Sequence, residues 1–337
     1  MRREPKSWAL PPPDPLPSQL TPDARAARLW ELLTAAVATD AAAPRVALSG
    51  GLDSRAVAAA AAAVGLPGLD AGTFGDPDCV DLPVAAQVAG HLGLPHRIHR
   101  LDSRAACLHA DRVWRATSGR GGLASAPGAD TDEAWADRGV LLSGNAGDVI
   151  WGDTARPGPS PARRLKKLGL TLPDRGDEVP PPPPWASPAG AAAWANLWTR
   201  QARVTWLGVL PRLAYTPVQL VCWHPPLLSF CLALTAEDRR GRALLRRMLA
   251  QHTTVSDAVA PPVRGPVHGI DRALRSPAGR ACLASMTEEQ PGREQLAAVG
   301  LRWRAVRRMV RQHSSGRRDR GAFLSRVWAL WRWGGRR

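Results

Sequence analysis

The sequence is poor in the features that mark secreted, membrane-spanning or disulfide-bonded proteins. Its 337 residues include five cysteines, Cys79, Cys107, Cys222, Cys231 and Cys282, with no CxxC pair and no zinc-ligand spacing. An odd number of unpaired cysteines favours a reducing compartment. Prolines interrupt the N-terminus, so no signal peptide is visible, and no run of about 18 apolar residues lacks charge or proline. We therefore expect a soluble, cytoplasmic protein with no membrane partner.

Tyrosine and phenylalanine are also scarce. The chain has one Tyr and three Phe beside 14 Trp, and we expect tryptophan to fill core sites that the other aromatics take elsewhere. Apolar residues make up 45 % of the chain, which excludes a disordered protein. The length is sufficient for a large core in one or two domains.

Acidic residues are scarce in the second half of the chain. Residues 161–337 carry 30 Lys and Arg against 11 Asp and Glu, and residues 293–337 carry 13 against 2. Such asymmetry points to an anionic partner such as nucleic acid. The alternative, which we favour, is an amphipathic helix with a solvated basic face. Its apolar residues would be Leu296, Val299, Trp303, Val306 and Val310, which recur at spacings of three or four.

Apolar patterning predicts alternating strands and helices in the first 150 residues. Helices are expected over 21–38, 52–64, 82–92 and 104–116, and strands over 46–49, 69–74, 97–101 and 140–143. Strands that alternate with helices form parallel βαβ units, and ligands of such sheets lie at the carboxyl ends of the strands. The sequence therefore predicts an α/β fold with a parallel sheet.

Composition divides the chain into four segments. Residues 1–20 are expected to form an irregular leader, 21–155 the α/β core, 156–190 a proline-rich insertion or linker, and 191–337 a mainly helical part with a basic tail from about 293. Helices are expected over 191–207, 227–234, 241–251 and 302–311, and in the last segment, GAFLSRVWALWRWGG.

The stretch SGGLDS, residues 49–54, carries the first chemical motif. Gly50 and Gly51 permit a tight turn whose amides can surround an anion at the start of the next helix. Ser49 and Ser54 can donate hydrogen bonds to phosphate oxygens. Asp53 would repel phosphate unless a divalent cation lay between them, and Mg²⁺ is commonly held by carboxylates and phosphates. The motif matches neither GxxxxGK[ST] nor GxGxxG, and it resembles the pyrophosphate loop of ATP pyrophosphatases.

A second motif, LSGNAGDVIWG, follows the strand expected over 140–143. It resembles the asparagine synthetase pattern LSG-[ED]-G-x-D-E-x-F-G-G. The segments FGDPDCVDLPVAAQVAGHLGLPHRIHRL, WHPPLLSFCLAL and GRALLRRMLA also resemble that family, so the similarity runs from about Arg45 to about Arg264. The relatives of this type include β-lactam synthetases and lasso peptide cyclases.

The resemblance implies the adenine-nucleotide α-hydrolase (HUP-like) type of α/β fold and a reaction with ATP and Mg²⁺. A substrate carboxylate is adenylated, and an amine then displaces AMP to give an amide. By matched position, Ser49, Gly50, Gly51, Asp53 and Ser54 would bind pyrophosphate and metal, Asp148 would be the second metal carboxylate, and Leu48, Phe74 and Gly144 would lie near the adenosine.

The chain departs from the family pattern at several of these positions. The acid that is thought to accept the amine's proton is replaced by Asn145, and a neutral amide is no general base. Val149 replaces the acid after Asp148. Arg242 replaces the family's lysine and keeps the charge that neutralises phosphate, in a planar fork instead of a point charge. Arg55 replaces a small hydroxyl residue, and we expect its charge to lie beside the phosphates.

These departures leave three functions open. The first is an ATP-dependent amide ligase of the asparagine synthase type without the Met-Cys glutaminase domain, since the chain begins Met-Arg-Arg. Its amine would come from free ammonia, from its own substrate or from an ammonia-supplying or precursor-peptide partner. The second is a catalytically impaired nucleotide-binding relative, and the third is an RNA-modifying adenylating enzyme that uses the basic tail.

Three histidines, His91, His96 and His99, lie close together in the sequence. Their spacing does not suit a helix-face zinc pair. We expect them to pack locally around a turn between a helix and a strand.

Overall fold

A computed structural model describes residues 10–101, 106–118, 139–152, 179–201, 209–255, 274–288, 290–298 and 301–316, together with residues 131, 134–136, 324, 327, 328 and 331. Within these ranges, no helix combines the length and the apolar character that crossing a bilayer requires. Most of the last predicted helix, in GAFLSRVWALWRWGG, lies outside the described residues.

The centre of the fold is a five-stranded sheet in the order β3-β2-β1-β4-β5. The strands are β1 (Arg45–Ala47), β2 (Asp70–Gly75), β3 (His96–Arg100), β4 (Leu141–Ser143) and β5 (Val218–Leu220). All neighbouring pairs are parallel, so the predicted α/β fold with a parallel sheet is confirmed. The four predicted strands are present, whereas β5 was not predicted.

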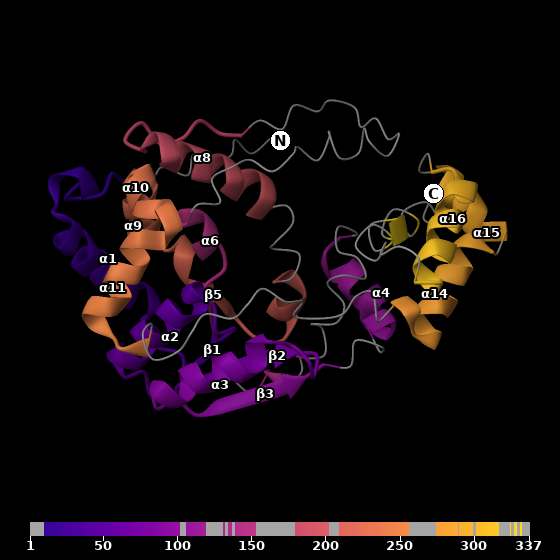
Figure 1. Cartoon of the computed structure of the whole chain (residues 1–337), viewed down its shortest axis with the longest axis horizontal. Coiled ribbons are helices and arrows are strands. Elements are labelled where there is room, and N and C mark those ends of the chain that lie inside the picture. Colours follow the sequence, from indigo (N-terminus) through magenta and orange to yellow (C-terminus); the bar gives the residue numbers. More distant parts are fainter. Residues whose placement is uncertain are drawn as a thin grey trace, which may run out of the picture.

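Helices follow the strands in the order that the sequence predicts (Figure 1). The main ones are α1 (Pro22–Val37), α2 (Leu52–Val64), α3 (Asp81–His91), α4 (Ala106–Ala116), α6 (Gly147–Ile150), α8 (Pro188–Asn196), α9 (Pro225–Ala233), α10 (Ala236–Arg239), α11 (Ala243–His252), α14 (Pro277–Thr287), α15 (Gln290–Ala298) and α16 (Trp303–Ser314). Short helical turns are η1 (Pro17–Gln19), η5 (Leu197–Gln201), η7 (Leu210–Ala214), η8 (Val221–Trp223) and η9 (Arg240–Arg242).

Capping residues explain where several helices begin and end. The Thr21 side chain accepts a hydrogen bond from the backbone N–H of Ala24, which caps α1 ahead of Pro22. Helix α2 ends at Gly65, which has the left-handed conformation that glycine tolerates best. Ser187 caps α8 in the same way as Thr21 caps α1. Helix α8 therefore starts inside the segment 156–190, which was predicted to be irregular to its end.

The strand order places β1 in the middle of the sheet, where the direction of chain progression reverses. The chain runs outward from β1 to β2 and β3, and then returns to the other side of β1 with β4 and β5. In open parallel sheets, this switch point forms a crevice at the carboxyl ends of the two adjacent strands. The segments after β1 and β4 carry the two sequence motifs, so the topology brings the motifs together.

At the amino ends of the two strands, a buried ion pair joins β1 to β2. Arg45 and Asp70 are register partners on the two strands, and Arg45 donates to Asp70 Oδ1 from Nε at 2.7 Å and to Oδ2 from Nη2 at 2.8 Å. Both side chains are almost fully buried. Bidentate geometry of this kind is what allows an arginine to remain in a core.

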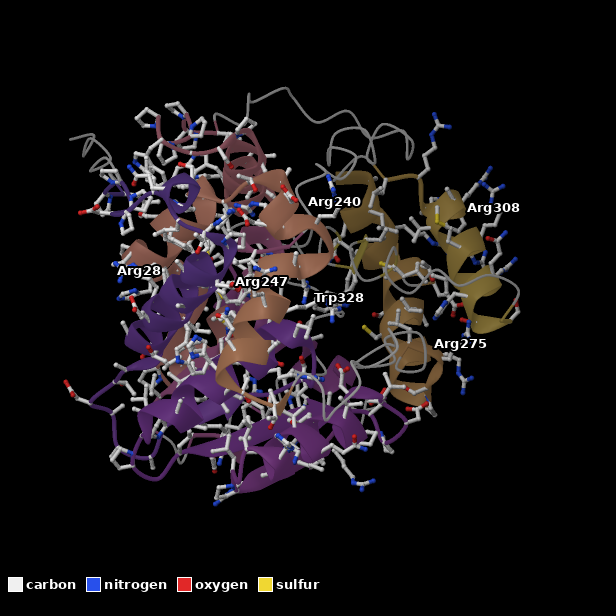
Figure 2. All side chains as sticks on the ribbon, turned by 60° about the vertical axis from the view of Figure 1, so that its left-hand side comes forward. Arg28, Arg240, Arg247, Arg275, Arg308 and Trp328 are labelled. Carbon is white, nitrogen blue, oxygen red and sulfur yellow. The ribbon has the colours of Figure 1, made fainter. Side chains whose placement is uncertain are left out.

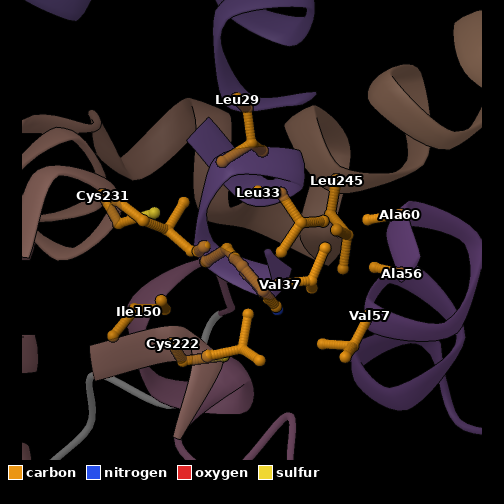
Figure 3. Close-up of a cluster of buried hydrophobic side chains, with 14 of the residues drawn as sticks. Leu29, Leu33, Val37, Ala56, Val57, Ala60, Ile150, Cys222, Cys231 and Leu245 are labelled. Atoms are coloured by element: carbon orange, nitrogen blue, oxygen red, sulfur yellow. The ribbon is translucent and has the colours of Figure 1, made fainter. Parts of the chain in front are cut away.

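The main hydrophobic core lies between the sheet and helices α1, α2, α9 and α11 (Figure 3). Leu33 and Val37 of α1 lie near Val57 of α2 and Leu245 of α11 in this cluster. These residues are fully buried, as are Leu29, Ala56 and Ala60. Small alanine side chains along α2 allow this close approach between the helices. Leu10, near the start of the described chain, also belongs to this core.

A second cluster of buried residues joins α4 to α14, α15 and α16. It contains Val113 and Trp114 from α4, Leu283 and Met286 from α14, Leu296 from α15 and Val306 from α16. Figure 1 shows these helices together at the C-terminal end of the chain. Within the described residues, the basic sequence from 293 contributes to this cluster through two helices, α15, which ends at Ala298, and α16, which begins at Trp303.

The outer face of α16 is strongly basic. Arg302, Arg304, Arg308 and Arg311 are exposed, whereas Val306 is buried. Figure 2 shows Arg308 pointing outward from this helix. The prediction of one continuous amphipathic helix from Leu296 to Val310 is wrong, because α15 ends at Ala298 and α16 begins at Trp303. Helix α16 by itself is amphipathic, with its apolar side packed inward and its basic side solvated.

Candidate functional site

The turn after β1 has the conformation that the two glycines suggested. Gly50 has a φ of 73°, in the left-handed region that favours glycine. A Cβ at this position would lie 2.7 Å from Val84 Cγ1 and 3.1 Å from the backbone nitrogen of Ala85. Any side chain here would therefore push the turn away from the start of α3.

Two serine hydroxyls brace this turn from inside. The Oγ atoms of Ser49 and Ser54 lie 3.0 Å apart, and Ser54 Oγ also accepts from the backbone N–H of Ser49 at 3.1 Å. Ser54 Oγ donates in turn to the carbonyl of Gly51 at 3.1 Å. Gly51 is the N-cap of α2 and supplies no side-chain cap. The first turn of α2 can therefore offer its amides to an anion.

Asp53 stands on that first turn of α2 and has two partners from distant segments. The indole Nε1–H of Trp151 donates to Asp53 Oδ1 at 2.7 Å. Arg242 Nη1 lies 3.1 Å from the same oxygen. Both Asp53 and Arg242 keep about a quarter of their side-chain surface exposed, at 22% and 25%. The carboxylate is thus held in place and still open to a ligand.

Burial is the dominant influence on the ionisation of Asp53. It raises the pKa of this carboxyl above its usual value, and the negative charge of Asp148 acts in the same direction. The charge of Arg242 and the hydrogen bond from Trp151 oppose the rise without cancelling it. A bound cation would offset this cost of burying the charge and favour the ionised carboxylate.

Asp148 approaches from the other side of the switch point, on the short helix α6. Gln201, buried at the end of η5, donates from Nε2 to Asp148 Oδ1 at 3.2 Å. Gly147, the first residue of α6, packs directly against the side chain of Asp53. A Cβ on Gly147 would be 2.9 Å from both Cβ and Cγ of Asp53. The absence of a side chain at Gly147 lets the two motifs close on each other.

The segment after β4 is equally tight. A Cβ on Gly144 would lie 3.2 Å from the carbonyl oxygen of Asp53. Ala146 occupies the left-handed region with φ 74°, where the family pattern has glycine. Asn145 is half-buried, and its Oδ1 atom accepts no hydrogen bond from any residue that the structure describes. A buried amide oxygen without a donor is an acceptor available to a ligand.

Arg242 reaches the site from the start of α11. Its own backbone is left-handed, with φ 61°, directly after Gly241 with φ 56°. This kink between η9 and α11 directs the guanidinium back toward Asp53. The side chain passes Gly152, where a Cβ would lie 3.5 Å from Arg242 Nε.

The expectation that Arg55 lies beside the phosphates is wrong. Its side chain is fully buried and donates to the carbonyl oxygens of Gly50 at 2.8 Å and of Val255 at 3.2 Å. Desolvation lowers the pKa of this guanidinium. Arg55 thus joins the phosphate turn to the residues after α11. A buried guanidinium needs hydrogen-bond acceptors, and these two backbone carbonyls supply them.

Two of the three residues expected near adenosine, Leu48 and Phe74, have different surroundings. Leu48 is buried and continues the sheet, with its N–H donating to the carbonyl of Gly72 at 2.9 Å. Phe74 is half-buried against the edge of Trp135, with ring centroids 5.7 Å apart, and under the guanidinium of Arg212 at 4.7 Å. Phe74 therefore already has an aromatic and a cationic neighbour.

Cys222 lies beneath the second motif. Its Sγ donates to the carbonyl oxygen of Gly144 at 3.6 Å. Complete burial raises the pKa of this thiol well above its usual value, and the charges of Asp53 and Asp148 raise it further. The side chain is consequently a neutral core residue and a poor nucleophile.

The donor groups of this site fit Mg²⁺ and nucleotide phosphates. The charge of Asp148 is close enough to Asp53 to raise the pKa of Asp53, and one or two carboxylates with phosphate oxygens are a common magnesium environment. Among the described residues, no group of three or more Cys, His, Asp or Glu forms a metal site. The metal would therefore depend on the phosphates for its remaining ligands.

Two of the three histidines make local side-chain contacts. His91 Nε2 lies 2.6 Å from Thr254 Oγ1, and His96 Nε2 lies 2.8 Å from Thr73 Oγ1. Burial lowers the pKa of His96.

Sequence reasoning missed two residues that support the carboxylates. Trp151 and Gln201 each give one neutral hydrogen bond, the first to Asp53 and the second to Asp148. A signal for Trp151 existed, since it stands where the family pattern has phenylalanine. No local pattern marked Gln201, whose role depends on how α8 and η5 pack.

Comparison with known proteins adds two findings. The family model described as asparagine synthase matches residues 28–216, which include both loop motifs. A comparison with curated proteins finds no match. Arg242 and Val255 lie beyond the matched segment, although both are joined to the phosphate turn.

Proposed function

Since the chain belongs to the asparagine synthase family, whose members are generally ATP-dependent ligases, we propose that it joins a carboxylate to an amine through an acyl-adenylate. The observation that carries this proposal is the convergence of Asp53, Asp148 and Arg242. They come from α2, α6 and the start of α11, and they meet at the carboxyl ends of β1 and β4.

In the first step, a substrate carboxylate oxygen attacks the α-phosphorus of ATP. The bond between this phosphorus and its bridge to the β-phosphate breaks, and pyrophosphate leaves with the electron pair. The turn at residues 49–51 and the start of α2 would hold the pyrophosphate, and Arg242 would exchange its contact with Asp53 for the phosphates. A Mg²⁺ ion held by Asp53 and Asp148 would neutralise charge on the departing oxygens.

In the second step, the amine attacks the acyl carbon, AMP leaves, and the amine nitrogen loses a proton. Asn145 is in the position of the family acid, and its Oδ1 atom has no donor among the described residues. This atom can accept a hydrogen bond from the amine and so orient it, but it cannot take the proton. We infer that the amine arrives unprotonated and that the proton lost from its nitrogen as the amide forms goes to solvent.

Substrate and partner follow from the same chemistry. The amine would be free ammonia, a group on the carboxylate substrate itself, or one delivered by an ammonia-supplying or precursor-peptide partner. A cytoplasmic location is the proposal that suits the free, buried cysteines Cys79, Cys222 and Cys231 of the described chain.

Pyrophosphate release from ATP is the direct test. Purified protein is incubated with Mg²⁺, ATP and panels of amino acids or peptides, and release should require a suitable carboxylate. Asp53→Ala should abolish release, whereas Asp40→Ala removes an exposed carboxylate outside the site and should leave it unchanged. Equal release by wild type and Asp53→Ala would contradict the proposal.

A nucleotide-binding relative without catalysis is the second candidate. Asn145 and Val149, in place of two family acids, are the observation that favours it. ATP binding with no pyrophosphate release for any substrate would support this candidate. The third candidate, an adenylating enzyme that modifies RNA, is favoured by the exposed arginines of α16 and would require tight, salt-sensitive binding of tRNA.

A further inference from the structure

Trp151 is a buried residue with a hydrogen bond that packing alone does not require. It is 1 % exposed, its indole N–H donates to Asp53 Oδ1 at 2.7 Å, and it stands where the family pattern has phenylalanine, which has no donor. We propose that Trp151 is a positioning residue that holds the carboxylate of Asp53 ready for Mg²⁺ bound with ATP. The inference rests on the proposed function, because it assigns a part in that same site.

The contacts of Asp53 are unevenly divided between its two oxygens. Trp151 and Arg242 both contact Oδ1, at 2.7 and 3.1 Å. Oδ2 accepts no hydrogen bond from the residues that the structure describes. One oxygen therefore orients the carboxylate, and the other is left for a ligand.

The two donors on Oδ1 differ in charge, and this difference decides which one still contacts Asp53 when nucleotide and metal are bound. The guanidinium of Arg242 is attracted by phosphates and repelled by a metal cation, so nucleotide and metal together weaken its contact with Asp53. The indole of Trp151 is neutral. It can keep its hydrogen bond while Asp53 retains the full negative charge that a divalent cation requires.

Packing fixes the indole in its place. A Cβ on Gly147 would lie 2.9 Å from Trp151 Cζ2 and equally close to Asp53, so the ring, the glycine and the carboxylate are in mutual contact. Arg239 holds the same helix from behind, donating from Nη1 to the carbonyl of Val149 at 3.0 Å. The direction of the N–H is therefore set by the fold of α6 before any ligand binds.

The test removes the N–H and retains the ring. One variant is Trp151→Phe, and a second carries benzothienylalanine at position 151, which keeps the bicyclic shape and replaces N–H by sulfur. The control is Trp194→Phe, because Trp194 is equally buried and donates to the carbonyl of Pro180 at 2.7 Å, away from both carboxylates. Binding is measured with Mn²⁺ as a spin probe and α,β-methylene-ATP, and again with the nucleotide alone.

We expect both changes at position 151 to weaken Mn²⁺ binding to the protein–nucleotide complex about tenfold, the effect of losing one hydrogen bond to a charged group. Metal-free nucleotide binding should change less than twofold, and Trp194→Phe should leave both affinities unchanged. Mn²⁺ affinity equal to wild type in the benzothienylalanine variant would overturn the inference. Equal losses with and without metal would do the same, since they indicate a purely structural role.

The design separates this inference from the function on which it rests. Wild-type protein that binds no metal–nucleotide complex would overturn both. Wild-type protein that binds the complex normally, with variants that bind it equally well, would overturn only the role of Trp151.

Discussion

Helix α8 packs so closely on the end of α9 that one methyl group should test the contact. A Cβ at Gly190 would lie 1.7 Å from the carbonyl oxygen of Leu232 and 2.6 Å from its carbonyl carbon. These are backbone atoms, which cannot rotate away as a flexible side chain could. Gly190→Ala must therefore push the two helices apart.

The cost can be assembled from known terms. Ordinary contact begins near 3.4 Å, so the backbones would need to separate by more than 1 Å. That movement breaks the hydrogen bond from the Ser187 N–H to the Leu232 carbonyl, now 3.1 Å long. Overpacking of about 1–3 kcal/mol and a lost hydrogen bond of about 1 kcal/mol give a loss of about 2–4 kcal/mol in the free energy of unfolding.

The matched control is Gly90→Ala in α3. Gly90 is also inside a helix, but a Cβ there meets nothing within 4 Å. Alanine should raise the free energy of unfolding by about 0.5–1 kcal/mol, since it restricts the unfolded chain and favours helix. Urea unfolding followed by circular dichroism measures both variants. A Gly190→Ala protein as stable as wild type would refute the packing of α8 on α9, and a destabilised Gly90→Ala protein would refute the open space at α3.

Three further predictions concern charge. Asn145→Glu restores the family acid and should raise the rate of amide formation near neutral pH several-fold, with pyrophosphate release unchanged. A pH–rate profile identical to that of wild type would contradict this prediction. Burial raises the pKa of Asp53, so the folded protein loses stability as pH rises through that pKa and the carboxyl ionises. Without nucleotide at pH 7, the Asp53→Asn protein should therefore unfold at a higher temperature than wild type. An unchanged or lower Tm would count against this prediction. Burial lowers the pKa of His96, so the unfolded chain protonates this residue at a higher pH than the folded protein does. Stability should therefore fall as pH drops below about 6.5, the usual pKa of histidine. Thermal unfolding of the His96→Gln protein should lose part of this pH dependence, and an unaltered dependence would argue against the prediction.

The sequence predicted most of the fold where local signals agree with the final packing. Helix α2 has the predicted bounds, from Leu52 to Val64, because a glycine turn precedes it and Gly65 stops it. Strand β5 and helix α14 were missed. The three residues Val218–Leu220 are too short to show a period of their own, and they become a strand only by pairing with β4.

For the candidate site, the sequence predicted which residues gather but not how their side chains are used. The two motifs meet because parallel strands place their following turns at one edge, as expected for Asp53 and Asp148. The predicted direction of the Arg55 side chain was wrong, because a position on a helix does not by itself tell whether a long side chain turns outward or into the core. The hydrogen bond from Trp151 was likewise beyond the sequence, since it depends on the close approach that Gly147 permits.

The attachment of α11 to the phosphate turn at both of its ends has a consequence for the order of folding. Arg242, before the helix, contacts Asp53, and the carbonyl of Val255, after it, accepts from Arg55, 200 residues earlier in the chain. A ribosome delivers the turn long before it delivers either anchor. The sheet can begin to form during synthesis, but the turn reaches its final shape only after residue 255 has emerged. A fragment that stops at residue 216, where the family match ends, would contain both motifs and still lack a finished site.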